Sequence, residues 1–315
     1  MRILITGAAG FVGYHVSIRL TEAGHRVVGL DNFCPYYSVD LKRDRAKLLK
    51  EQGISIVEKD IQDQPGLQRV VEEYEITHII HLAAQAGVRY SLKEPKTYLE
   101  SNIDGFLSLL ETVRAHPHIT TVWASSSSVY GTNTKTPFSE QDRTDSPANL
   151  YGATKKSNEL MAYAYNNLFG MKLIGLRFFT VYGPWGRPDM AYFLFADKIM
   201  KGEPIEVFGH GKLRRDFTYI DDIVDGVCAA LDAPKSYDIY NLGNSHPESV
   251  LDLISSLESS LGKKAKMQMM DRPIEDIEET FADTSHAKED LGFAPKVSLH
   301  EGIQRFSSWF RSYYA

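Results

Sequence analysis

A glycine-rich turn near the start constrains the fold of this chain more than any other feature. The residues T-G-A-A-G-F-V-G occupy positions 6–13, directly after the apolar run Arg2–Thr6. Three glycines at this spacing, between a strand and a helix, give a tight turn and close helix–strand packing. The free N–H groups and the positive end of the helix would then meet a pyrophosphate. The sequence therefore predicts a dinucleotide-binding turn made by Gly7, Gly10, Phe11, Val12 and Gly13.

Short apolar runs alternate with helical patterns as far as Phe178. The runs are rich in Val, Ile and Leu, which is typical of strands buried on both faces of a parallel sheet. They cover Arg2–Thr6, His25–Asp31, Ser55–Asp60, Thr77–Leu82, Thr120–Ala124 and Met171–Phe178. Amphipathic segments between them cover Phe11–Ala23, Leu41–Gln52, Tyr98–Ala115 and Tyr151–Phe169. This alternation predicts an α/β fold with a doubly wound parallel sheet of the Rossmann type.

The pattern changes after Phe178, where shorter helices and isolated strands follow a loop rich in Gly and Pro. We expect helices near Tyr192–Lys201, Ser249–Gly262 and His300–Ser312, and strands near Ile205–Phe208 and Lys266–Met270. The length of 315 residues fits two domains. We assign residues 1–179 to the dinucleotide-binding domain and 180–315 mainly to a smaller mixed α/β lobe. A segment near 216–238 is expected to return to the first domain.

Composition excludes several kinds of protein. The chain has 35 basic and 41 acidic residues and a net charge of −6, so no global positive field favours nucleic acid. No stretch approaches the roughly 18–20 apolar residues of a membrane span. Two cysteines, Cys34 and Cys228, give no disulfide framework and indicate a reducing compartment. The first residues enter a strand pattern at once, leaving no room for a signal peptide, so we expect a cytoplasmic protein.

An acidic residue ends the second predicted strand. A carboxylate at Asp31 can accept hydrogen bonds from both adenosine ribose hydroxyls and would repel a 2′-phosphate, which favours NAD over NADP. On its own, Asp31 could equally be a strand-end carboxylate in a turn, but the glycines before it favour the cofactor role. Asn32 follows in the same loop. Asp60 and Ile61, at the end of the third predicted strand, lie where the adenine ring would sit, although Asp there is also a helix-cap signal.

Two further patterns indicate catalysis. Y-G-A-T-K places Tyr151 and Lys155 four residues apart on one helix face, so an ammonium would lie beside a phenol. That cation and a nicotinamide would favour the phenolate, which is otherwise a poor base at neutral pH. The hydroxyls of A-S-S-S-S-V-Y-G at 124–131 fit a ligand-binding strand end better than a core. Metal-ligand and nucleophile motifs are absent, and His78 and His81 point to opposite faces of a strand, so we expect no metal.

Together these motifs resemble the extended short-chain dehydrogenase/reductases, the sugar-nucleotide epimerases and dehydratases. The resemblance also includes H-L-A-A-Q at 81–85, Asn102 and R-D-F-T-Y-I-D-D at 215–222. Within that group the chain is most similar to the UDP-glucuronate 4-epimerases. This similarity lies in D-N-F-C-P-Y-Y at 31–37, A-A-Q-A-G-V-R-Y-S at 83–91 and L-R-F-F-T-V-Y-G-P-W-G-R-P-D-M-A at 176–191.

The resemblance implies roles for individual residues. On the cofactor side it implies that NAD contacts Leu82, Ala83, Ala84, Gln85 and Phe178, with Asn102 bracing the neighbouring strands and helix. It implies Ser126 as the catalytic hydroxyl, Tyr151 as the general base, and Lys155 as the residue that tunes Tyr151 and holds the nicotinamide ribose. On the substrate side it implies that Ser127 and Ser128 lie close to the sugar and that Arg215 pairs with the diphosphate.

The implied reaction is NAD-dependent C4 epimerisation of UDP-glucuronate to UDP-galacturonate through a 4-keto intermediate. Thr180 replaces an Asn common in enzymes for neutral sugars, which favours the acidic substrate. The β-keto acid formed can lose carbon dioxide, so its carboxylate must be held in place. Candidates for that carboxylate clamp are Ser127, Ser128, Thr180 and Arg187, with Arg89 as a further substrate-side residue. Arg187 could instead anchor its own loop.

Several alternatives stay open from the sequence. They are a UDP-hexose (glucose or N-acetylglucosamine) 4-epimerase, a UDP-glucuronate decarboxylase and, more distantly, a non-catalytic module that senses NAD. The segment D-R-P-I-E-D at 271–276 departs from the family pattern, and Arg272 there is either a second phosphate ligand or a solvated loop residue. The resemblance also implies a homodimer formed through helices near Tyr98–Ala115 and Tyr151–Phe169.

Overall fold

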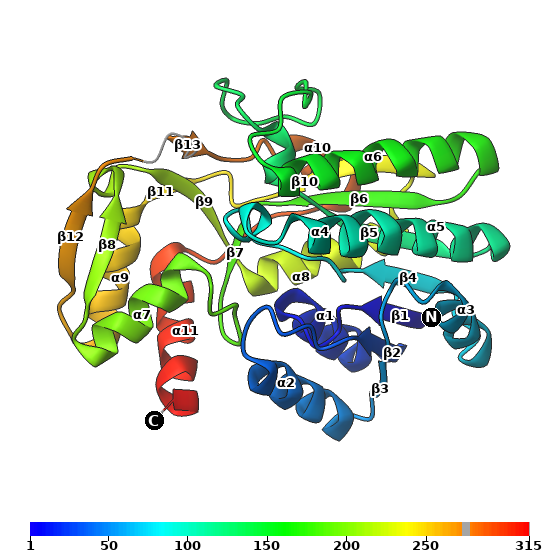
Figure 1. Cartoon of the computed structure of the whole chain (residues 1–315), viewed down its shortest axis with the longest axis horizontal. Helices are drawn as coiled ribbons and strands as arrows, with labels where there is room; N and C mark the ends of the chain where they lie inside the picture. Colours follow the sequence, from blue (N-terminus) through cyan, green and yellow to red (C-terminus); the bar gives the residue numbers. More distant parts are fainter. Residues whose placement is uncertain (273–277, 315) are drawn as a thin grey trace.

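A seven-stranded parallel sheet forms the centre of the computed structural model, which describes residues 1–272 and 278–314 (Figure 1). The strands lie in the order β10-β6-β5-β4-β1-β2-β3, and all neighbours are parallel. They are β1 (Arg2–Thr6), β2 (Arg26–Asp31), β3 (Ser55–Glu58), β4 (His78–His81), β5 (Thr120–Ser126), β6 (Leu173–Phe178) and β10 (Tyr237–Leu242). The predicted doubly wound sheet is confirmed.

Six of these strands coincide with the predicted apolar runs, whereas β10 was missed. Its sequence, Y-D-I-Y-N-L, carries polar residues that hide a strand pattern. Asn241 is fully buried, and its side-chain amide donates to the carbonyls of Phe138 and Asp283 at 2.9 and 3.1 Å. A buried amide with its hydrogen bonds satisfied is tolerated inside a sheet, but no sequence pattern announces its partners.

Helices cover both faces of the sheet (Figure 1). One face carries α1 (Phe11–Glu22), α2 (Val39–Glu51) and α8 (Ile220–Ala229); the other carries α3 (Gln64–Glu73), α4 (Pro95–Tyr98), α5 (Gly105–Ala115) and α6 (Leu150–Phe169). Two apolar cores result, one on each face, with Ile3 and Val16 in the first and Leu4 and Leu109 in the second. The helix predicted over 98–115 contains a π-helical segment, Leu99–Asp104, between α4 and α5.

The remaining elements form a smaller lobe beside the sheet (Figure 1). Its helices are α7 (Ala191–Lys201), α9 (Val250–Leu261) and α11 (Leu299–Tyr314), and α10 (Ser285–Leu291) lies next to β10. Strand β8 (Pro204–Phe208) pairs with β12 (Lys266–Met270), while β9 (Arg214–Tyr219) pairs with β7 (Thr180–Tyr182), β11 (Pro247–Ser249) and β13 (Glu279–Thr280). The boundary at residues 179/180 stays a prediction, with α8 and β10 lying on the large sheet.

No helix in the described part of the chain is long and apolar enough to cross a membrane.

Candidate active site

The carboxyl ends of the parallel strands open into a cleft of about 780 Å³. Most of the predicted site residues line it. On the cofactor side these are Gly7, Gly10, Phe11, Val12, Gly13, Asp31, Asn32, Ile61, Leu82, Ala83, Ala84, Gln85, Tyr151, Lys155 and Phe178. On the substrate side they are Arg89, Ser126, Ser127, Ser128, Thr180 and Arg187. Ligands of α/β sheets bind at this edge, so the cleft is the candidate active site.

The glycine-rich turn has no room for side chains. Gly7 has φ +73°, and a Cβ on it would come within 2.8 Å of the Leu82–Ala83 backbone. A Cβ on Gly13 would lie 2.1 Å from the carbonyl oxygen of Gly7. Gly10 begins α1 with no side-chain cap, and the first helical turn has no acidic residue. No side chain caps the N–H groups at this end of α1. They therefore remain available to an anionic ligand in the cleft.

Asp31 is fixed at the end of β2. Its Oδ2 accepts from the Ala9 N–H at 2.9 Å and its Oδ1 from the Phe33 N–H at 2.8 Å. Burial raises the pKa of Asp31, while these two bonds and the charge of Lys42 oppose the rise. Lys42 lines the same cleft and was not predicted, because on sequence it is one of several basic residues on α2.

Asp60 does not line the cleft. Strand β3 already ends at Glu58, and the Asp60 carboxylate accepts from the Asn32 side chain at 2.7 Å and from the Gln62 N–H at 2.9 Å. Asp60 is therefore a turn residue, whereas the cap of α3 is Asp63; a contact of Asp60 with adenine stays a prediction.

Asn102 lies behind the cleft wall rather than in it. It is 2% exposed; its Oδ1 accepts from the Gln85 N–H at 2.8 Å, and its Nδ2 donates to the Gln85 carbonyl at 3.0 Å. Nδ2 also donates to Thr154 Oγ1 on α6 at 3.0 Å. Asn102 thus joins the loop after β4 to the helix that carries Tyr151, which is the bracing expected of it.

Ser126, Tyr151 and Lys155 come together where β5 ends and α6 begins. Asn149 caps α6 by accepting from the Gly152 N–H at 2.9 Å, which starts the helix just before Tyr151. Ser126 lies close enough to Tyr151 to lower the pKa of its phenol, and Ser126 Oγ accepts from the Ser128 N–H at 3.1 Å. Lys155 is 3% exposed and donates to the Ala124 carbonyl at 2.8 Å.

Burial dominates the ionisation of this group. It raises the pKa of Tyr151, and the Ser126 hydrogen bond and the charge of Arg187 oppose the rise. Burial also lowers the pKa of Lys155 to about 8. Arg187 is therefore a cation that lowers the pKa of Tyr151, and the tuning by Lys155 that the i, i+4 spacing suggests stays a prediction. The Lys155 ammonium lies toward the carbonyl at the end of β5.

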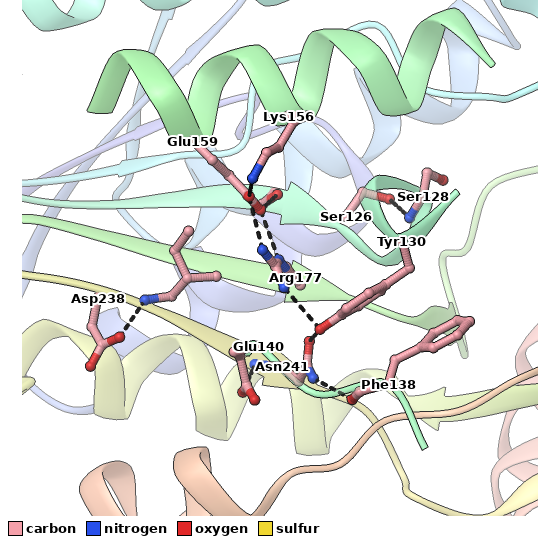
Figure 2. A network of polar contacts seen from close by, with 12 residues as sticks. Ser126, Ser128, Tyr130, Phe138, Glu140, Lys156, Glu159, Arg177, Asp238 and Asn241 are labelled. Carbon is pink, nitrogen blue, oxygen red and sulfur yellow. Dashed lines mark hydrogen bonds and ion pairs between the residues drawn. The ribbon is translucent and has the colours of Figure 1, made fainter. Parts of the chain in front are cut away.

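A buried ion pair holds the serine strand, α6 and β6 together (Figure 2). Arg177 donates to both carboxylate oxygens of Glu159, at 2.8 and 2.9 Å, and both side chains are at most 4% exposed. Ser125 donates to Glu159 at 2.8 Å, and Arg177 donates to the Tyr130 hydroxyl at 2.9 Å. Since Ser125 precedes Ser126 and Glu159 lies one turn beyond Lys155, this network fixes the serine strand against the Tyr/Lys helix.

Arg187 is held by an acidic neighbour that sequence reasoning did not single out. It donates through Nε and Nη2 to the two oxygens of Asp189, at 3.0 and 2.6 Å. Tyr36, from the loop after β2, donates to Asp189 Oδ2 at 2.8 Å. Asp189 and Tyr36 both line the cleft. The long Asn32–Ser38 loop and the string around Arg187 were signals, but the contact joins loops about 150 residues apart.

Of the three other arginines considered from the sequence, Arg89 lines the cleft, whereas Arg215 and Arg272 do not. Arg215, on β9, does not line this cleft and donates to the carbonyls of Arg214 and Glu278, at 2.8 and 3.4 Å. Arg272 pairs with Glu278 at 3.5 Å, and the rest of the divergent segment, 273–276, lies outside the described residues. Arg89 lies over the Phe208 ring at 5.0 Å, where the two lobes face each other.

Comparison with known proteins identifies relatives over the whole length. The model of the NAD dependent epimerase/dehydratase family matches residues 3–243. UDP-glucuronate 4-epimerase 3 of Arabidopsis thaliana is 51% identical over 99% of this chain and 77% of its own. Two solved structures align over 100% of both chains. The UDP-glucuronic acid 4-epimerase of Bacillus cereus with UDP-glucuronic acid and NAD has a TM-score of 0.92 at 34% identity. The UDP-glucose 4-epimerase of Thermotoga maritima with UDP-glucose has 0.89 at 30%. The chain belongs to the NAD dependent epimerase/dehydratase family.

Proposed function

We propose that this protein interconverts UDP-glucuronate and UDP-galacturonate by NAD-dependent epimerisation at C4. The observation that carries the proposal is the meeting of Ser126, Tyr151 and Arg187 in one cleft: two hydroxyls for the C4 oxygen and one cation for a carboxylate. The relative from Arabidopsis thaliana supports the same substrate, because half of its aligned residues are identical to those of this chain.

The cleft fits NAD. The uncapped N-terminus of α1 can accept a pyrophosphate, and Gly7 lets it approach the backbone. The Asp31 carboxylate, already held by two N–H groups, keeps lone pairs for ribose hydroxyls and leaves no place for a 2′-phosphate. When bound, NAD would accept a hydride from C4 of the sugar and later return it, so NAD ends the cycle unchanged.

The protein residues manage the proton and the sugar. Tyr151 takes the proton of the C4 hydroxyl while the sugar is oxidised at C4. It returns the proton when the ketone is reduced. Ser126, which lies beside Tyr151, donates to the same substrate oxygen. Lys155 would hold the nicotinamide ribose. Between the two steps the 4-keto sugar turns about its diphosphate linkage, so that its other face meets the cofactor.

The substrate carboxylate needs separate control. In the 4-keto intermediate it belongs to a β-keto acid, and loss of carbon dioxide requires the breaking bond to align with the carbonyl π system. Ser127, Ser128, Thr180 and Arg187 would hold the carboxylate away from that alignment. A decarboxylase would need the opposite arrangement.

NMR of the products formed from UDP-glucuronate tests the proposal. A galacturonate signal is expected. A pentose with carbon dioxide would make the protein a decarboxylase, and an unchanged spectrum beside turnover of UDP-glucose would make it a neutral-sugar epimerase. Thr180→Ala and Arg187→Ala are expected to increase the pentose fraction; if neither alters it or the affinity, the carboxylate assignment is wrong.

We also propose that the protein is a cytoplasmic homodimer formed through α5 and α6. These helices expose apolar side chains on the outside of the molecule, among them Leu107, Leu160 and Tyr163, at 41%, 59% and 57%. Such side chains on neighbouring helices are typical of an interface. Both cysteines are unpaired, in keeping with a reducing compartment.

A further inference from the structure

We propose that Asp189 is a positioning residue that decides how Arg187 meets the substrate carboxylate. The inference deepens the proposed function, on which it rests. Arg187 and Asp189 both line the cleft that holds Tyr151 and Thr180, and the two side chains are only about a quarter exposed. A cation aimed at an anionic substrate is here already paired with a carboxylate of the protein.

The pairing uses one particular edge of the guanidinium. Asp189 accepts from Nε and Nη2 of Arg187, which is the side-on, two-bond arrangement that a carboxylate prefers. Among the residues that the structure describes, none accepts a hydrogen bond from Nη1 of Arg187. The substrate carboxylate must therefore meet Arg187 through the Nη1 end, with hydroxyls completing its shell. Asp189 sets the plane of the guanidinium and so the direction of that contact.

Two loops fix Asp189 in turn. The Tyr36 hydroxyl donates to Asp189 Oδ2 at 2.8 Å, and the Tyr36 ring lies 5.8 Å from the Arg187 guanidinium carbon. Gly87, at φ +107°, packs against this group: a Cβ there would lie 2.2 Å from the Tyr36 hydroxyl and 3.6 Å from Arg187 Nη2. The guanidinium is thus enclosed by three loops and is not a freely moving surface cation.

The pair also sets the charge that the substrate meets. Burial raises the pKa of Asp189, but the charge and hydrogen bonds of Arg187 outweigh it, so the pKa ends below its usual value. Both side chains are therefore ionised at neutral pH, and together they are neutral. Nη1 of Arg187 therefore orients a substrate carboxylate, but the neutral pair attracts it only weakly. Removing the Asp189 charge should tighten the binding of the carboxylate and place it less accurately.

The experiment compares Asp189→Asn with two matched variants in NAD-loaded protein. Asp189→Glu keeps the charge, and Tyr36→Phe removes one hydrogen bond but keeps both charges. Dissociation constants for UDP-glucuronate and for UDP-glucose are measured by calorimetry in a Tyr151→Phe background, which prevents turnover. KM and kcat for UDP-glucuronate are measured with Tyr151 intact.

For Asp189→Asn we expect UDP-glucuronate to bind about two- to five-fold tighter, the effect of one partly exposed ion pair, with no change for UDP-glucose. Its KM and kcat should both fall, because tighter binding at the wrong geometry does not help the reaction. Asp189→Glu and Tyr36→Phe keep both charges, so neither should bind UDP-glucuronate more tightly than the parent. If Asp189→Asn lost the same affinity for UDP-glucuronate as for UDP-glucose, the proposed role of Asp189 would be wrong. Unchanged affinity and kinetics in this variant would also overturn it. A parent that neither binds nor converts UDP-glucuronate would instead overturn the proposed function.

Discussion

Replacing the buried lysine of the active site should make the fold more stable while it abolishes activity. Lys155 is 3% exposed, its ammonium donates to the Ala124 carbonyl, and burial lowers its pKa from 10.5 to about 8. Below pH 8 the folded protein therefore carries the full cost of a buried charge. Between about pH 8 and 10.5 the unfolded chain keeps a proton that the folded chain has lost, so stability rises with pH.

The size of the effect follows from the shift. A difference of about 2.5 pKa units corresponds to roughly 3 kcal/mol at neutral pH. Lys155→Met keeps the length of the side chain and removes this cost, but it leaves the Ala124 carbonyl without its donor, which costs about 1–2 kcal/mol. The charge effect is the larger of the two. We expect Lys155→Met to be about 1–2 kcal/mol more stable at pH 7.

Urea unfolding of nucleotide-free protein measures this difference. The gain of Lys155→Met over the parent should be largest at pH 7 and should shrink by pH 9.5, where the parent lysine is mostly neutral when folded. Activity should be lost at every pH. The variant could instead be less stable than the parent at pH 7, or its gain in stability could be independent of pH. Either result would mean that the native structure offsets the cost of burying the Lys155 charge, and the reasoning would be wrong.

Three other variants test the site and the assembly. Tyr151→Phe should lower turnover by on the order of 10²–10⁴-fold while UDP-glucuronate still binds, measured by a coupled assay and calorimetry; undiminished turnover would remove Tyr151 from the reaction. Arg177→Met leaves the buried Glu159 carboxylate without its main partner and should cost about 3–5 kcal/mol in urea unfolding, more than the double variant with Glu159→Leu; equal costs would contradict a buried pair. Leu160→Glu should dissociate the proposed dimer in sedimentation experiments, and a variant that sediments like the parent would place the interface elsewhere.

The parts of the fold that were predictable are those whose signal is local. An apolar run such as Arg2–Thr6 fixes a buried strand by itself, and the glycines that follow fix the turn. Strand β10 was missed because Asn241 is stabilised by carbonyls far away in sequence. Helix α3 was missed although Asp63 caps it, accepting from the Gly66 N–H at 3.0 Å, because a cap signal without a long apolar stripe is weak.

The site residues that could be predicted are likewise those with a local signal in the sequence. Tyr151 and Lys155 were found because four residues of spacing on a helix puts them on one face. The effect of Arg187 on the pKa of Tyr151 was missed, because Arg187 lies on a loop after β7, far from Tyr151 in sequence. Asp189 stands in a quoted motif but has no meaning until the structure shows its oxygens on Arg187.

Arg45 shows most clearly that a site of this kind depends on residues outside its sequence motifs. On sequence it is one basic residue of an amphipathic helix, yet in the structure it is fully buried. It donates to the Ala9 carbonyl inside the glycine-rich turn at 2.9 Å, and to the carbonyls of Trp185 and Gly186 at 2.6 and 3.0 Å. Because Gly186 directly precedes Arg187, one guanidinium joins the cofactor turn to the loop that carries the proposed carboxylate ligand. The two halves of the site are therefore held in one geometry by a cation that does not itself line the cleft, and only the folded chain could reveal that connection.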